Sequence, residues 1–280
     1  MPELPEVETI RLGLQKYLVG HRIVNVATRV SKLFIGPAKK VIGAKITGLK
    51  RIGKGLIIEL DNDYVLAVHL KMTGQLIYSD NRTKNIVLSV KVGGSTLPSK
   101  YSHVIFTLDN GAFLYYNDLR QFGWVKVLKK DEVMQVPFFK EMGPEPLKDL
   151  TLEKFQKIVY ESNLAIKVLL MDQKKIGGIG NIYANDALFE ARIDPRRKAK
   201  TLSMAEIETL YNSILKILQK ALDYGGSSDE NFVNALGQEG NYQKYALVYG
   251  REGEKCRGCD GTVQKIKLGG RGTFFCSCQK

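Results

Sequence analysis

The chain has 280 residues, enough for one large domain or, as we expect, two smaller ones, and its 44% hydrophobic and 25% charged residues are usual for a soluble globular protein. No apolar run reaches the roughly 18 residues of a membrane-spanning helix, and the acidic N-terminus lacks the apolar centre of a signal peptide, so we expect a cytoplasmic protein without membrane contact. Its 42 Lys and Arg against 29 Asp and Glu give a net charge of +13, which favours a polyanionic partner, although a protein that is merely basic is an alternative.

The first predicted element is a helix that begins after a short arm. Pro5 suits the first helical position, and Glu6 and Glu8 complement the positive end of the helix dipole. Gly20 can end the helix. Because Pro5 begins the helix, residues 1–4 form an arm ahead of its N-terminus. The apolar residues that recur at helical spacing are Val7, Ile10, Leu14, Tyr17 and Leu18.

The composition of residues 23–128 is typical of β-strands. β-Branched and aromatic residues dominate the segments IVNVATRV, GLIIEL, YVLAVHL, HVIFTL and AFLYY. Turns at Asp61-Asn62 and Asp109-Asn110 separate two pairs of these segments and predict two hairpins. We therefore expect residues 1–135 to form an antiparallel two-layer β-sandwich domain, in a protein of the α+β class.

A linker and a helical domain are expected next. The prolines of MGPEPL place the linker at residues 136–148, and residues 149–240 show helical periodicity. The glycine-rich stretch KKIGGIGN predicts a turn ahead of a helix at residues 182–191. The residues that follow Gly226 are polar and typical of a mobile loop. The expected helix caps and stops are Thr151, Ser203 with Glu206, and Gly225-Gly226.

The last domain, residues 241–280, contains all four cysteines of the chain. Nothing indicates secretion, so clustered thiolates are expected to bind metal rather than to form disulfides. Their C-x2-C-x16-C-x-C spacing fits a closed tetrahedral site for one structural zinc ion that folds a β-ribbon. Arg271 lies at the tip of this ribbon, where it can reach a phosphate or remain a solvated turn residue. The predicted ligands are Cys256, Cys259, Cys276 and Cys278.

Five motifs and the cysteine ribbon resemble those of the formamidopyrimidine-DNA glycosylase family. The motifs are MPELPEVET, KMTGQL, DLRQFG, MGPEPL and GGIGNIYANDALF, in the family's order over nearly the whole chain. The resemblance implies a β-sandwich, a helix-two-turns-helix element and a zinc ribbon. It also implies a monomeric DNA glycosylase and apurinic/apyrimidinic-site lyase that binds damaged double-stranded DNA. Such an enzyme removes oxidised purines, namely 8-oxoguanine and formamidopyrimidines, and nicks the strand by β,δ-elimination.

The resemblance gives the N-terminal arm the central catalytic role. Once Met1 is removed, Pro2 carries a free secondary amine, and a reference α-amino group with a pKa of roughly 8 is partly nucleophilic at neutral pH. Attack at a deoxyribose C1′ would expel the base and leave a Schiff base for the eliminations. The family also implies proton transfer by Glu3 and a second acidic role for Glu6. Without the resemblance, the same residues would be an ordinary helix start.

The same motifs imply roles for four residues of the β domain. Lys54, between two glycines, corresponds to a catalytic lysine that donates a proton and contacts the lesion strand, although such a lysine alone is usually a surface residue. Met72, Arg120 and Phe122 correspond to residues that fill the gap left by an extruded base. Taken singly, Met72 and Phe122 would be core residues.

Three further residues are expected to contact DNA from the rest of the chain. Lys167 and Asn181 correspond to residues that hold the DNA backbone near the lesion. Asn181 follows a glycine turn at a helix N-terminus, which suits phosphate, while a purely structural turn is the alternative. The third is Arg271, which can reach a phosphate and is also expected to be one of the catalytic residues.

The chain departs from the family's pattern at two motifs. The last cysteine pair is C-x-C where the family has C-x2-C, which puts ligation by Cys278 in doubt. Tyr101-Ser102-His103 stands where the family has His-x-His. The DNA contact of His103 carries over, and that of Tyr101 is in doubt.

Two loops also depart from the pattern. Residues 85–99 are longer than usual and predict an extra hairpin or loop. The loop expected to cover the lesion, near residues 226–237, holds Asp229 and Glu230, where basic or neutral residues are commoner. Base preference can therefore differ from that of the family.

Two alternative functions remain open from the sequence. One is an endonuclease VIII-like enzyme that prefers oxidised pyrimidines, although PELPEVET favours the formamidopyrimidine-DNA glycosylase branch. The other is a zinc-ribbon protein that recognises damaged DNA without chemistry. Borohydride trapping on an abasic duplex separates the enzymes from the binding protein, because only an amine nucleophile gives a covalent adduct.

Overall fold

The computed structural model describes residues 1–280 and divides into two compact units. One contains Met1–Lys140 and Leu222–Gln243, and the other contains Glu141–Ala221 and Lys244–Lys280. The first boundary falls inside the expected linker. Residues 222–240 differ from the expectation, because they belong with the β unit rather than with the helical domain.

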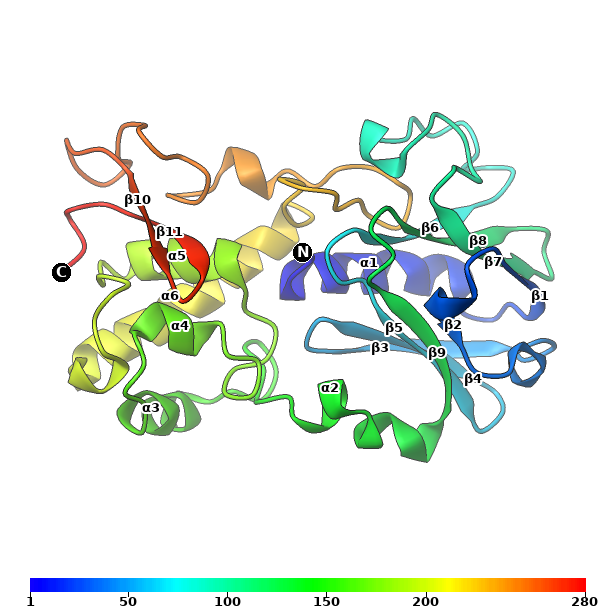
Figure 1. Ribbon diagram of the computed structural model, residues 1–280, viewed down its shortest axis with the longest axis horizontal. Coiled ribbons are helices and arrows are strands. Elements are labelled where there is room, and N and C mark those ends of the chain that lie inside the picture. Colours follow the sequence, from blue (N-terminus) through cyan, green and yellow to red (C-terminus); the bar gives the residue numbers. More distant parts are fainter. The chain divides into compact units, whose positions relative to one another are not determined.

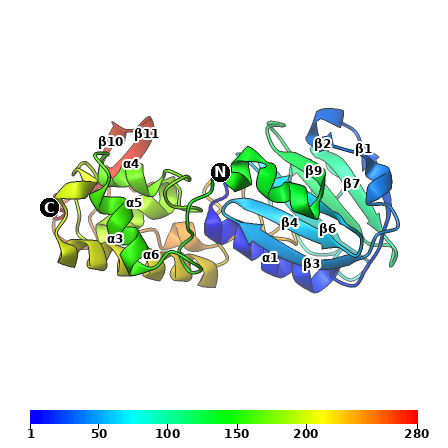
Figure 2. The same cartoon turned by 90° about the horizontal axis from the view of Figure 1, so that it is seen from below.

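The first unit has two β-sheets and one long helix (Figures 1 and 2). The four-stranded sheet has the antiparallel order β1 (Ile23–Thr28), β7 (Ser102–Leu108), β8 (Phe113–Asp118), β6 (Gly74–Ser79). The five-stranded sheet has the order β2 (Phe34–Ile35), β9 (Trp124–Lys129), β5 (Tyr64–His69), β4 (Gly55–Leu60), β3 (Ile46–Ile52). All its pairs are antiparallel except the short β2–β9 pair, which is parallel.

Helix α1 (Leu4–Leu18) packs beside both sheets, against β3, β4 and β6. Its apolar face joins side chains of both sheets in one buried core, with Leu14 and Leu18 fully buried. The expected two-layer sandwich and its two hairpins, β4–β5 and β7–β8, are confirmed. The shorter elements of this unit are η1 (Ser31–Leu33), η2 (Ala38–Lys40), η3 (Val90–Val92), η4 (Lys130–Gln135) and α2 (Pro137–Lys140).

The second unit is helical and ends in a two-stranded ribbon. Two expected helix caps are present: the Thr151 hydroxyl accepts from the Lys154 amide at 3.3 Å, and Glu206 accepts from the Ser203 amide at 2.7 Å. The elements of this unit are α3 (Leu152–Tyr160), α4 (Ile166–Leu170), α5 (Asn181–Glu190), η5 (Ala199–Thr201), α6 (Met204–Asp223), η6 (Tyr242–Lys244), β10 (Gln264–Leu268) and β11 (Arg271–Phe275), although the last residues of α6 and the first of η6 lie in the first unit. None of the helices is both long and apolar enough to span a bilayer.

Candidate active site and zinc ribbon

The N-terminal arm is buried at the start of α1. Pro2 is buried, and Glu3 and Glu6 are only 3% and 1% exposed. One oxygen of Glu6 accepts from the Glu3 amide at 2.8 Å, and the other accepts from the Ser227 amide at 2.7 Å. Such amide donors and the helix N-terminus stabilise a buried carboxylate. Glu6 therefore links the arm to the loop of residues 226–240.

The 226–240 loop is well packed in this structure rather than loosely attached. Gly226 has a φ of +80°, and a Cβ on it would lie 2.9 Å from Glu6 Oε1, so this position requires glycine. The hydroxyl of Ser228 donates to the Phe232 carbonyl and accepts from the Gly240 amide, at 2.8 and 2.9 Å. The carboxylate of Glu230 contacts the Met1 ammonium at 2.8 Å. The loop thus meets the N-terminal arm at Glu6 and at Met1.

Lys54 lies in the turn between β3 and β4 and is only 4% exposed, so the surface alternative is wrong for this residue. Arg51 joins the turn to α1, because its guanidinium donates to the Gly53 carbonyl at 3.0 Å and pairs with Glu8 at 3.0 Å. Partial burial acts to raise the pKa of Glu8, but hydrogen bonds and charges of Arg11 and Arg51 outweigh it and leave that pKa below its usual value. The Lys54 turn is therefore fixed next to the first turns of α1.

His69, at the end of β5, was not singled out from the sequence. Burial, and then the positive charges of Lys71 and Lys54, lower the pKa of His69 to about 3. Its Nδ1 accepts from the Lys71 amide at 2.9 Å, as a neutral ring can. His69 therefore remains neutral at physiological pH and adds no positive charge beside Lys54.

The residues expected to fill the gap in the duplex lie on two adjacent turns. Met72 is on the β5–β6 turn, and Arg120 and Phe122 are on the β8–β9 turn. Phe122 is 55% exposed, with the Arg120 guanidinium 4.7 Å from its ring centre. This exposure overturns the alternative that Phe122 is a core residue. An exposed ring next to a cation suits insertion between bases.

Asp118 holds these two turns together, and sequence reasoning missed it. It is fully buried and accepts from the Thr73 hydroxyl at 2.5 Å, the Arg120 amide at 3.2 Å and the Gly123 amide at 2.8 Å. The signal in the sequence was the aspartate that opens DLRQFG, at the end of a strand. Its role is to position the two turns.

The side chains of Tyr101 and His103 both contact other residues of the chain. His103 is 7% exposed and donates from Nε2 to the Asp118 carbonyl at 3.0 Å. The ring of Tyr101 lies against Gly93, where an added Cβ would come within 2.1 Å of Cδ2. Contacts of these two residues with DNA stay predictions, and the observed role of Tyr101 is to pack against the segment that precedes it.

In the second unit, Lys167 is buried and bonded to the ribbon. The side chain is 1% exposed, and its ammonium donates to the Gly272 carbonyl at 2.9 Å and to the Thr273 hydroxyl at 2.7 Å. Lys167 thus holds the turn of the ribbon, on which Arg271 is exposed. A direct phosphate contact by Lys167 stays a prediction.

Asn181 begins α5, directly after Gly180, and is partly exposed. The next turn of this helix also contacts the ribbon, because the Asn185 side chain accepts from the Phe274 amide at 2.8 Å. The N-terminus of α5 and the ribbon are thus fixed to one framework. This arrangement is compatible with the expected backbone contact of Asn181.

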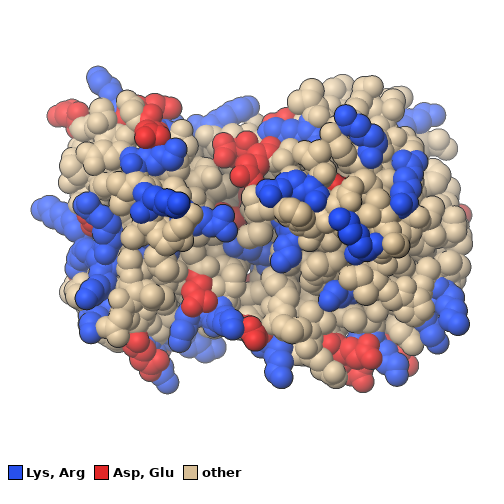
Figure 3. Space-filling model, viewed as in Figure 1, with Lys and Arg blue, Asp and Glu red and all other residues tan.

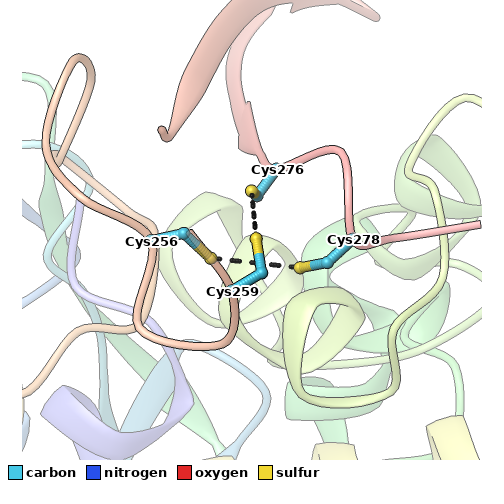
Figure 4. Close-up of side chains that lie close together, drawn as sticks. All are labelled: Cys256, Cys259, Cys276 and Cys278. Atoms are coloured by element: carbon cyan, nitrogen blue, oxygen red, sulfur yellow. Dashed lines mark hydrogen bonds between the residues drawn. The ribbon is translucent and has the colours of Figure 1, made fainter. Parts of the chain in front are cut away.

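The four cysteines converge on one point (Figure 4). Cys256 and Cys259 precede β10, Cys276 and Cys278 follow β11, and their sulfurs all lie within 4.8 Å of one another. The Cys259–Cys276 and Cys256–Cys278 sulfur distances are 3.4 and 3.9 Å. Tetrahedral zinc with bonds of about 2.3 Å needs sulfurs about 3.8 Å apart, so the ligand set fits. The short C-x-C spacing does not keep Cys278 out of the site.

Positive charge is widespread on the surface. In the face shown in Figure 3, Lys and Arg side chains occur over both units, and Asp and Glu side chains are fewer. This agrees with the net charge of +13 and with a polyanionic partner.

Comparison with known families matches nearly the whole chain. Residues 1–125 match the formamidopyrimidine-DNA glycosylase N-terminal domain, residues 142–232 its H2TH domain, and residues 253–280 a zinc finger found in this family and in isoleucyl-tRNA synthetases. The zinc-finger match, together with the four converging thiolates, assigns one structural zinc ion to the ribbon.

Individual relatives are similar in sequence to this chain over their full length. The chain is 41% identical to formamidopyrimidine-DNA glycosylase of Pelotomaculum thermopropionicum, covering 100% of this chain and 99% of the relative. It is 38% identical to that of Streptococcus mutans, covering 100% of both. The structure of Lactococcus lactis Fpg with abasic-site DNA superimposes with a TM-score of 0.87 at 35% identity, over 99% of each chain. The chain therefore belongs to the formamidopyrimidine-DNA glycosylase family.

Proposed function

We propose that this protein excises oxidised purines from double-stranded DNA and then cleaves the strand at the abasic site, with Pro2 as the nucleophile. The observation that supports this most is the buried N-terminal arm, where Pro2 adjoins Glu3 and the firmly held carboxylate of Glu6. The protein acts as a monomer on damaged DNA in the bacterial cytoplasm, at the nucleoid. The bacterial relatives and the solved complex of Lactococcus lactis Fpg with abasic-site DNA support this setting.

The reaction follows from the chemistry of a secondary amine. After removal of Met1, the Pro2 nitrogen attacks C1′, the C1′–base bond breaks, and the base leaves with the bonding electron pair and takes up a proton. The Pro2 nitrogen then loses its proton, and the C1′–O4′ bond breaks as O4′ takes up a proton, which leaves an iminium. The iminium draws electrons, so loss of a C2′ proton expels the 3′ phosphate, and loss of a C4′ proton expels the 5′ phosphate. Glu3 transfers protons at the sugar. The zinc, held by four thiolates, folds the ribbon and takes no part in these steps.

A panel of duplexes tests the substrate class. We expect single-turnover excision to be faster on 8-oxoguanine and formamidopyrimidine than on oxidised pyrimidines, and cleaved strands to end in phosphates on both sides of the gap. Faster excision of oxidised pyrimidines would favour the endonuclease VIII-like alternative. Tight binding of every duplex without cleavage would favour the binding protein.

Lys54→Ala should reduce base excision about 100-fold, the lower end of what a positioned proton donor contributes. Cleavage at a preformed abasic site should fall much less, because no base must be protonated or held there. The measurement is the ratio of the two single-turnover rates. Lys50→Ala is a matched control, since Lys50 lies on β3, the strand that leads into the Lys54 turn, is 68% exposed and pairs with Glu59. Equal losses on both substrates would contradict the assignment.

A further inference from the structure

The 80–99 segment, which connects β6 and β7, is bonded to the 226–240 loop through Lys91. The Lys91 ammonium donates to the Ser228 carbonyl and contacts Glu239 Oε2 at 3.0 Å. The neighbouring Ser89 hydroxyl donates to the other Glu239 oxygen at 2.6 Å, and its amide donates to the Gly237 carbonyl at 2.8 Å. The segment therefore holds both ends of the loop.

Apolar and amide contacts strengthen the same junction. Val92 of the segment and Val233 of the loop are both fully buried, in one cluster with Ile77 of β6. The side chain of Gln75 donates to the Lys91 carbonyl at 3.0 Å and to the Asn231 carbonyl at 2.8 Å. The side-chain amide of one residue of the sheet thus fixes the segment and the loop relative to each other.

The opposite side of the loop faces the catalytic arm. The Ser227 amide donates to Glu6 at 2.7 Å, a contact in which Met1 takes no part. Ser227 and Ser228 are consecutive, so the residue held by Lys91 directly follows the residue held by Glu6. A shift of the Ser228 carbonyl therefore displaces the loop at the point where it meets the arm.

We propose that Lys91 is a positioning residue, which fixes the 226–240 loop against the catalytic arm and so promotes excision of a damaged base. A loop without helix or strand loses conformational entropy when it orders around a base, and anchoring it beforehand reduces that cost. The anchoring matters only while a base is present, because an abasic site leaves the loop nothing to contact. This inference rests on the proposed glycosylase function of the arm.

Lys91→Met tests the proposal, because methionine retains an unbranched chain but loses the donors and the charge. We expect 8-oxoguanine excision to fall about tenfold, as for loss of one charged hydrogen bond, while cleavage at a preformed abasic site changes less than about twofold. Amide hydrogen exchange of residues 227–239 in the free protein should become faster. Lys84→Met is the matched control, since Lys84 lies exposed in the same segment.

Two further variants keep the test decisive. Lys91→Arg retains a cation and should keep most of the excision rate. Glu239→Gln removes the negative charge that Lys91 contacts and should show part of the Lys91→Met defect, so it serves as the test if Lys91→Met fails to fold. Equal losses on both substrates, or unchanged excision and unchanged exchange, would overturn the role of Lys91. Absence of excision by the unmodified protein would instead overturn the proposed function, and the exchange measurement would still report on the anchoring.

Discussion

Pro2→Gly is expected to reduce both base excision and abasic-site cleavage about 1,000-fold, within the range of a positioned catalytic group, while DNA binding stays nearly unchanged. Glycine leaves a primary amine, which can still attack, but its position is less fixed than that of the proline ring. Pro2 is itself buried, and the adjacent Glu3 amide is held by Glu6 at 2.8 Å. The loss should therefore fall on chemistry and not on affinity.

Borohydride trapping on an abasic duplex measures this nucleophile directly. The unmodified protein should give a covalent adduct, and Pro2→Gly should give much less under the same conditions. A version with one extra residue ahead of Pro2 that is not removed should give none, since the nitrogen is then a peptide amide. Undiminished adduct from that blocked version would show that another amine reacts. Binding to a duplex with a tetrahydrofuran abasic analogue is the control for folding.

The sequence predicted well those features that depend on neighbours along the chain. The hairpins followed from alternating strands and Asp-Asn turns, and the caps at Thr151 and Ser203 followed from local side-chain chemistry. The zinc site could also be predicted, because the cysteines of each pair lie within three residues of each other. Such patterns report local geometry, which a single sequence displays.

Features that depend on distant partners could not be predicted in this way. Residues 222–240 were assigned to the helical domain because they follow its longest helix, yet their bonds run to Glu6 and Gln75, more than 150 residues earlier. Lys167 was expected to hold the DNA backbone, and its bonds to Gly272 and Thr273, more than 100 residues away, were not predicted. Burial of a lysine by such partners leaves no periodic signal in the sequence.

Removing zinc should have the second large effect, because besides the metal site only a small apolar cluster and a few hydrogen bonds hold the ribbon. A two-stranded hairpin alone is marginal in water, and the few apolar residues around β11 form only a small cluster with Phe189. Metal binding contributes about 10 kcal/mol or more to folding in comparable thiolate sites. We therefore expect a chelator to unfold the ribbon and release the turn that Lys167 and Val168 hold.

Loss of that turn should weaken DNA binding in the same way as Arg271→Ala. Arg271 is exposed at the start of β11, so one phosphate contact would be lost, and the slope of log affinity against log salt should fall by about 0.9. The loss is then greatest at low salt. Metal analysis should find one zinc per chain, and Lys255→Ala, an exposed change in the same ribbon, should bind normally.

Restoring zinc distinguishes the zinc-stripped protein from the Arg271→Ala variant. It should rescue binding by the stripped protein and leave Arg271→Ala unchanged, because the mutant lacks the guanidinium and not the fold. Arg271 depends on the metal through Lys167, whose two acceptors, Gly272 and Thr273, directly follow it in β11. If the protein holds no zinc and still binds abasic DNA normally, both the four-thiolate site and the dependence of Arg271 on it are wrong.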